Sequence, residues 1–71
     1  MPSDIRQQFG RRLRELRRKA GYTQQQLAEL AELDYKHLQQ LESSHPPYPR
    51  LDTLDKLAKA FKITPSKLLD F

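Results

Sequence analysis

The stretch TQQQLAELAELDYKHLQQLE, residues 23–42, decides the fold. Thr23 is followed three residues later by a glutamine, and at this spacing each side chain can accept a hydrogen bond from the other residue's backbone amide at the start of a helix. Asp34 provides a second helix start further along. Because only a short connection separates the two segments, the stretch predicts two short helices joined by a tight turn, at about residues 23–31 and 34–42.

The apolar residues of this stretch recur at helical spacing, which gives each helix a buried and an exposed side. With few inward positions, the second helix can stand out from the surface and expose most of its side chains. Two helices arranged in this way have the layout of a helix-turn-helix motif. The residues expected to be buried are Leu27, Ala28, Leu30 and Ala31 in the first helix and Leu38 and Leu41 in the second.

An amphipathic helix is predicted before the motif, at about residues 4–19. Ser3 or Asp4 can cap its start, and Gly21 can take the left-handed conformation after its end. Basic residues fill the faces away from the core. The apolar stripe of this helix comprises Ile5, Phe9, Leu13, Leu16 and Ala20.

Three prolines within residues 46–49 interrupt the helical pattern after the motif and predict a stiff loop. No stretch alternates with a period of two. The fold class is therefore all-α, a compact bundle of about five helices that forms one domain over residues 1–71. The apolar residues expected in the last two helices are Leu51, Leu54, Leu57, Ala58 and Phe61, followed after the Thr64-Pro65 helix start by Leu68 and Leu69.

Composition excludes several classes of protein. The 71 residues leave room for one hydrophobic core, and the absence of cysteine excludes disulfides and thiolate zinc sites. His37 and His45 are too few to suggest a metal site. We expect no catalytic residue, cofactor or small-molecule substrate, because the chain has little room for a cavity. It has no apolar run of the ~20 residues that span a membrane and no secretory signal, so we expect a cytoplasmic location.

The order of residues resembles the phage repressor and Cro family of helix-turn-helix DNA-binding domains. The resemblance implies that the second helix of the motif enters the major groove of double-stranded DNA. One difference lies in the turn, where the family usually has glycine and this chain has Glu32; a left-handed backbone there costs about 1 kcal/mol. The resemblance is carried by residues 21–31 and 33–42, by residues 9–17 as the first helix, and by residues 54–63 with Leu68 and Leu69 as the last two.

The resemblance also assigns roles to polar residues. Lysine can donate to guanine O6 and N7, and glutamine can pair with adenine N6 and N7, although either type taken singly is more often an ordinary exposed residue. Phosphates repel the Asp34 carboxylate unless it accepts a hydrogen bond from a cytosine amine, and a helix-capping role alone would account for this residue, so capping is favoured. Asp34, Tyr35, Lys36 and Gln40 match the base-reading positions, Gln24 matches a phosphate contact that braces them, and Arg50 matches a position that approaches the minor groove.

Two further sets of residues concern the architecture. Arg17 and Glu42 match an interior ion pair of the family, which would fix the angle of the recognition helix; an exposed Arg17 that touches phosphate is the alternative.

Apolar residues near the C-terminus exceed what a short last helix can hide, which favours a two-fold contact. The expected dimer interface is Ile63, Leu69 and Phe71.

Charge is concentrated at one end of the chain. Residues 1–19 hold seven basic and two acidic residues, a local +5 within a net charge of +4. Such a cluster attracts phosphate or anionic lipid, or is simply a solvated helix face. We expect a sequence-specific transcriptional regulator that binds a palindromic operator as a homodimer. The alternatives are an antitoxin or co-regulator with a protein partner and, last, a membrane-surface helix, because residues 4–19 need their apolar stripe for the core.

Overall fold

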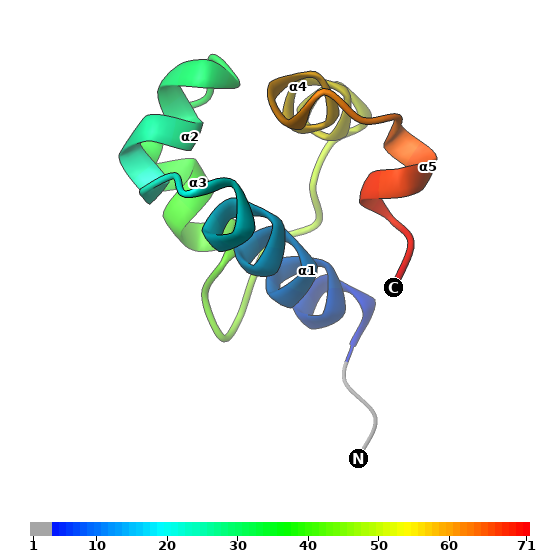
Figure 1. Ribbon diagram of the computed structural model, residues 1–71. Coiled ribbons are helices and arrows are strands. Elements are labelled where there is room, and N and C mark those ends of the chain that lie inside the picture. Colours follow the sequence, from blue (N-terminus) through cyan, green and yellow to red (C-terminus); the bar gives the residue numbers. More distant parts are fainter. Residues whose placement is uncertain (1–3) are drawn as a thin grey trace.

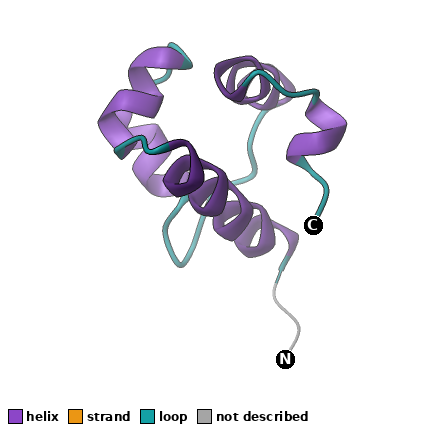
Figure 2. Cartoon of the chain, viewed as in Figure 1, coloured by secondary structure: helices purple, strands orange, loops and turns teal. Residues whose placement is uncertain are grey.

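The computed structural model describes residues 4–71, which contain five helices and no strand. The predicted all-helical bundle is therefore confirmed, and each end of the first three helices lies within one residue of its prediction. Figure 1 and Figure 2 show α2 beside α3 and α4 beside α5, with α1 running between the two pairs. The helices are α1 (Ile5–Ala20), α2 (Gln24–Leu30), α3 (Tyr35–Leu41), α4 (Leu51–Phe61) and α5 (Pro65–Leu68).

Local hydrogen bonds define both ends of α1. The Asp4 carboxylate accepts from the Arg6 amide at 2.8 Å, and the Gln7 side chain accepts from the Asp4 amide at 3.3 Å. Ser3, the other predicted cap, lies outside the described residues. Gly21 ends the helix with φ 81°, a left-handed conformation that costs glycine little.

The connection between α2 and α3 is as tight as the sequence predicts. At the start of α2, the Thr23 hydroxyl accepts from the Gln26 amide at 3.1 Å, and the Gln26 side chain accepts from the Thr23 amide at 2.9 Å. The turn itself lies at the other end of this helix. The backbone is left-handed at Glu32, with φ 56°. The Leu33 amide donates to the Ala28 carbonyl at 2.8 Å, so the turn satisfies a backbone group at the end of α2 and offsets part of the strain at Glu32.

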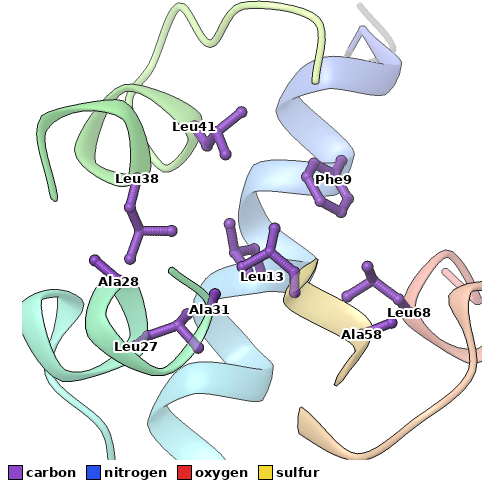
Figure 3. Packing of buried hydrophobic residues seen from close by; sticks show 10 residues of the cluster. Phe9, Leu13, Leu27, Ala28, Ala31, Leu38, Leu41, Ala58 and Leu68 are labelled. Carbon is purple, nitrogen blue, oxygen red and sulfur yellow. The ribbon is translucent and has the colours of Figure 1, made fainter. Parts of the chain in front are cut away.

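Apolar side chains from all five helices, and one from the turn after α2, meet in one core. Figure 3 shows Leu13 of α1 between Leu27 and Ala31 on one side and Ala58 and Leu68 on the other. Because α1 contributes to both halves, it joins the motif to the C-terminal helices. The buried apolar residues are Phe9, Leu13, Leu27, Ala28, Ala31, Leu38, Leu41, Leu57, Ala58 and Leu68.

Four residues predicted to be buried are exposed, and each lies at the end of a helix. Ile5 begins α1, Leu30 ends α2 and Leu51 begins α4, with exposures of 63%, 53% and 84%. Ala20, the last residue of α1, is exposed as well. These positions follow the apolar stripe, but each lies in the terminal turn of its helix, and the rest of the described chain leaves it largely uncovered. Leu69, predicted for the last helix, is 42% exposed just after α5.

Gly10 allows α1 and the end of α3 to approach closely. A Cβ atom at this position would lie 2.7 Å from the backbone carbonyl oxygen of Leu41, a distance at which the backbone must shift. Glycine in the middle of a helix otherwise costs about 1 kcal/mol relative to alanine. The close contact explains why this position lacks a side chain.

We therefore expect Gly10→Ala to lower the free energy of unfolding by about 1–3 kcal/mol, the usual range for overpacking, in spite of the better helix propensity of alanine. Urea unfolding followed by circular dichroism measures the effect. Arg18→Ala, at an exposed position of the same helix, is the control and should change stability little. An unchanged or higher midpoint for Gly10→Ala would contradict the close approach.

Candidate nucleic-acid interface

The outward side of α3 is a polar surface. Leu38 and Leu41 are fully buried, so the opposite side of this helix faces outwards. Asp34 caps the helix, with its carboxylate accepting from the Lys36 amide at 2.9 Å, which confirms the favoured capping role. The exposed side chains of the helix are those of Tyr35, Lys36, Gln39 and Gln40.

Glu42, directly after α3, is a buried carboxylate whose side chain is 1% exposed. Arg17 binds it twice, with Nε 2.8 Å from Oε2 and Nη2 3.0 Å from Oε1. Gln24 Nε2 donates to Oε1 at 3.3 Å. Arg14 Nη2 donates to the backbone carbonyl of Glu42 at 2.7 Å, and Arg14 Nε lies 3.7 Å from Oε1. Residues of α1, α2 and the end of α3 thus meet at one carboxylate.

This arrangement leaves Arg17 little freedom. Its side chain is 12% exposed, and its Nη1 donates to the Tyr22 carbonyl at 3.0 Å, so most of its donors are occupied within the protein. Sequence reasoning missed Arg14 as a second cationic partner of Glu42. The signal that was available is its spacing, because residues three apart lie on neighbouring positions of a helix surface.

Gln24 lies at the start of α2 and is half-buried. One hydrogen of its amide is directed to Glu42, as described above, and the NH₂ group has a second hydrogen to donate. The side chain can therefore be held by the carboxylate and still donate to an outside acceptor. The resemblance implies that Gln24 contacts a phosphate and also supports the base-reading residues. This geometry is compatible with both roles.

Arg50 is the residue before α4 and does not cap the helix with its side chain. Its Nε lies 3.2 Å from Asp52 Oδ1, and its side chain is 82% exposed. An ion pair this exposed contributes little to stability. Arg50 is thus accessible from outside, and it follows the proline-rich loop in the sequence.

The start of α1 holds the proline-rich loop. The Arg6 guanidinium lies 4.4 Å from the centre of the Tyr48 ring, and Gln7 Nε2 donates to the Ser44 carbonyl at 3.1 Å. Arg6 also binds Asp4, and its side-chain hydrogen bond to that carboxylate is the main reason that the pKa of Asp4 lies below its ordinary value. The contribution of Asp4 to stability is therefore present above an unfolded pKa of about 3.9 and is lost at lower pH.

The three predicted interface residues are not equally accessible. Leu69 and Phe71 are exposed, whereas Ile63 is half-buried and packs against the core. Arg12 of α1 donates to the carbonyls at the end of α5, at 2.9 Å for the nearer of the two, and so fixes the position of this helix against α1.

Residues 4–71 contain no group of three or more side chains that could hold a metal ion. Within the same residues no helix has the length and apolar character needed to cross a membrane. A short helix with a polar outer face, held in place by a buried carboxylate at its end and preceded by a tight turn, defines a helix-turn-helix protein.

Comparison with known proteins agrees with this class. The chain belongs to the helix-turn-helix family, whose family model matches residues 13–68, and it is a DNA-binding transcriptional regulator of the Cro/C1 type. A crystal structure of the restriction-modification controller protein C.AhdI from Aeromonas hydrophila is similar, with a TM-score of 0.82 and 38% identity over 89% of this chain and 94% of that one. No curated protein matched the chain.

Removing one member of the Arg17–Glu42 pair leaves a buried charge without its partner, which typically costs about 3–5 kcal/mol, whereas removing both costs less. We expect the free-energy coupling in a cycle of Arg17→Met, Glu42→Leu and the double variant to exceed ~1 kcal/mol. Denaturant unfolding gives the four free energies. Strictly additive effects of the two substitutions would show that the pair contributes no coupling.

Proposed function

We propose that this regulator binds a two-fold symmetric DNA operator as a homodimer, with α3 of each copy in the major groove. The observation that carries the proposal is the polar outer face of α3, which is kept outwards by buried leucines and by the side chains around Glu42. A helix inserted in the major groove can read base edges directly. The similarity to a restriction-modification controller protein supports the regulatory part of the proposal.

Lys36 and Gln40 are the proposed base-reading residues, because they are exposed and one helical turn apart on the outer face of α3. Tyr35 can touch a thymine methyl group or a phosphate. Asp34 contributes chiefly as the helix cap. Gln24 is the proposed phosphate contact.

Leu69 and Phe71 support the homodimer. Both are exposed and lie two residues apart near the end of the described chain, and apolar side chains of this size favour an isologous contact. Ile63 adds its exposed part to the proposed interface. A small interface gives weak association in the absence of DNA, and two half-sites about one helical turn apart hold both protomers together. Arg50 is proposed to approach the minor groove.

Selection of bound duplexes from a random pool tests the function. The proposal predicts a palindromic consensus with two equal half-sites. Recovery of a single half-site would contradict the homodimer but not the reading of DNA by α3. No enrichment of any sequence would contradict a sequence-specific function and favour a protein partner.

We expect Lys36→Ala and Gln40→Ala each to cost on the order of 1–3 kcal/mol of binding free energy at one base pair and to relax the preference there. Gln24→Ala should weaken binding to all sequences evenly, because phosphates carry no sequence information. Affinities for a set of single-base operator variants distinguish the two patterns. Gln39→Ala is the control on the same helix. An equal loss of affinity for all operator variants with Lys36→Ala would show that Lys36 contacts the DNA backbone and not a base.

We expect Leu69→Glu to abolish a concentration-dependent dimer in sedimentation equilibrium and to leave the helical circular dichroism unchanged, because a carboxylate cannot be buried unpaired at an apolar interface. Ser66→Glu adds the same charge at an exposed position of α5 and serves as the control. A wild-type protein that remains monomeric at millimolar concentration and gains nothing from a second half-site would exclude the dimer.

A further inference from the structure

A dimer that reads two half-sites has to hold its two reading helices at a fixed distance. One added base pair moves a half-site by ~3.4 Å along the DNA axis and turns it by roughly 34–36°. A rigid dimer therefore fits one spacing of the half-sites, whereas a loosely joined dimer fits several. In this protein α3 and the apolar residues of the proposed interface lie in different parts of the chain, so the connection between them determines how rigid the dimer is.

Helix α1 forms the middle of that connection. Towards α3, its Arg17 binds Glu42 with two hydrogen bonds, of 2.8 and 3.0 Å. Towards α5, its Arg12 donates to the carbonyls of Lys67 and Leu68, at 2.9 and 3.3 Å. The two arginines lie five residues apart, which is less than two turns of a helix. One rigid element thus joins the end of the reading helix to the end of α5.

Helix α5 depends on this contact for its direction. It lies beside α4 (Figure 1) and contains four residues, of which Leu68 alone is buried. A helix of one turn can pivot about a single buried side chain. The Arg12 guanidinium adds a second fixed point, because it is a planar cation that binds two adjacent carbonyls left without partners at the end of the helix.

The exposed residues of the proposed interface directly follow the carbonyls that Arg12 binds. Leu69 is 42% exposed and Phe71 is 50% exposed. Arg12 and Phe71 line the same open hollow of about 330 Å³ between α1 and the end of the chain, so packing against α1 leaves the Phe71 ring room to move. A rotation of α5 against α1 would move both apolar side chains, and the axis of a two-fold contact would move with them.

We propose that Arg12 is a positioning residue that sets the spacing between the two DNA half-sites. The inference rests on the proposed homodimer and extends it, because it names the side chain that makes the dimer rigid. In each protomer Arg12 holds Leu69 and Phe71 in one orientation relative to α1, and α1 holds α3. The two α3 helices of the dimer are then kept at one distance and one rotation. Arg12 acts through α5 and reads no base.

Operators with altered spacing test this role. The probes are duplexes that carry two copies of the half-site selected from the random pool, at the selected spacing and at spacings one base pair shorter and longer, and a duplex with one half-site. The wild-type protein should prefer the selected spacing. Arg12→Met keeps the apolar stem of the side chain and removes its donors.

Arg12→Met should bind the selected spacing several-fold more weakly than the wild type, because a looser dimer lowers the effective concentration of the second α3 at its half-site. It should bind the altered spacings several-fold more tightly than the wild type, because α5 can turn to fit them. Its affinity for the single half-site should not change, since Arg12 contacts no DNA in this account.

Arg18→Met is the matched control. It removes the same charge from an exposed position of α1, about 120° around the helix axis from Arg12. Any loss of general charge attraction lowers affinity equally at every spacing, so this variant should keep the wild-type preference. Arg12→Lys keeps the charge but replaces the planar fork by one ammonium group, and its preference should lie between those of the wild type and Arg12→Met.

The outcomes separate the proposal from its alternatives. An Arg12→Met protein with the wild-type spacing preference would overturn it, whether or not affinity falls equally at every spacing. Weaker binding at the selected spacing with no gain at the altered ones would show that Arg12 only strengthens the interface, and would overturn it too. If circular dichroism shows that Arg12→Met does not fold, Arg12→Lys carries the test, and a wild-type preference for that variant then overturns the proposal.

The proposed function has a separate result. If the wild-type protein gains no affinity from a second half-site at any spacing, the homodimer itself fails. That result comes from the wild-type protein alone and does not depend on any Arg12 variant.

Discussion

The buried carboxylate of Glu42 is the constraint on which the rest of the structure depends. Burying an unpaired charge costs several kcal/mol, which is comparable with the whole stability of so small a domain. Glu42 therefore has to meet Arg17 and Gln24, and this requirement fixes where α3 ends relative to α1 and α2. Leucine packing gives the domain its core, but apolar contacts are not directional. The ion pair adds the direction that a recognition helix needs.

The same place explains why α1 combines a glycine with several arginines. Gly10 lets the helix approach the last carbonyl of α3, and Arg14 and Arg17 then reach the residue that follows. The core stripe of α1, with Phe9 and Leu13, faces the other helices. One helix thus positions α3 on one side and joins α4 and α5 on the other. Helices α2 and α3 are too short to be stable alone and depend on this support.

Local signals in the sequence predict most of the fold. The capping roles of Thr23 and Asp34 can be predicted because capping involves only residues close together in the sequence. Leu38 and Leu41 are buried, as their spacing indicates. Periodicity identifies a side of a helix but not whether its terminal turns are covered, as the exposure of Ile5, Leu30 and Leu51 shows. The contact of Arg17 with Glu42 was expected only from the family resemblance. The roles of Gly10 and Arg14 depend on how closely two helices approach, and no local pattern contains that distance.

Residual dipolar couplings of the Glu42→Gln variant test the central claim most directly. Glutamine keeps the shape of the side chain and removes the charge that Arg17 and Gln24 bind. If the carboxylate fixes the direction of α3, the backbone couplings of residues 35–41 should no longer fit the alignment that describes α1, while those of α4 should still fit it. Couplings of all three helices that fit the wild-type arrangement would show that apolar packing alone orients the recognition helix, and would contradict the account.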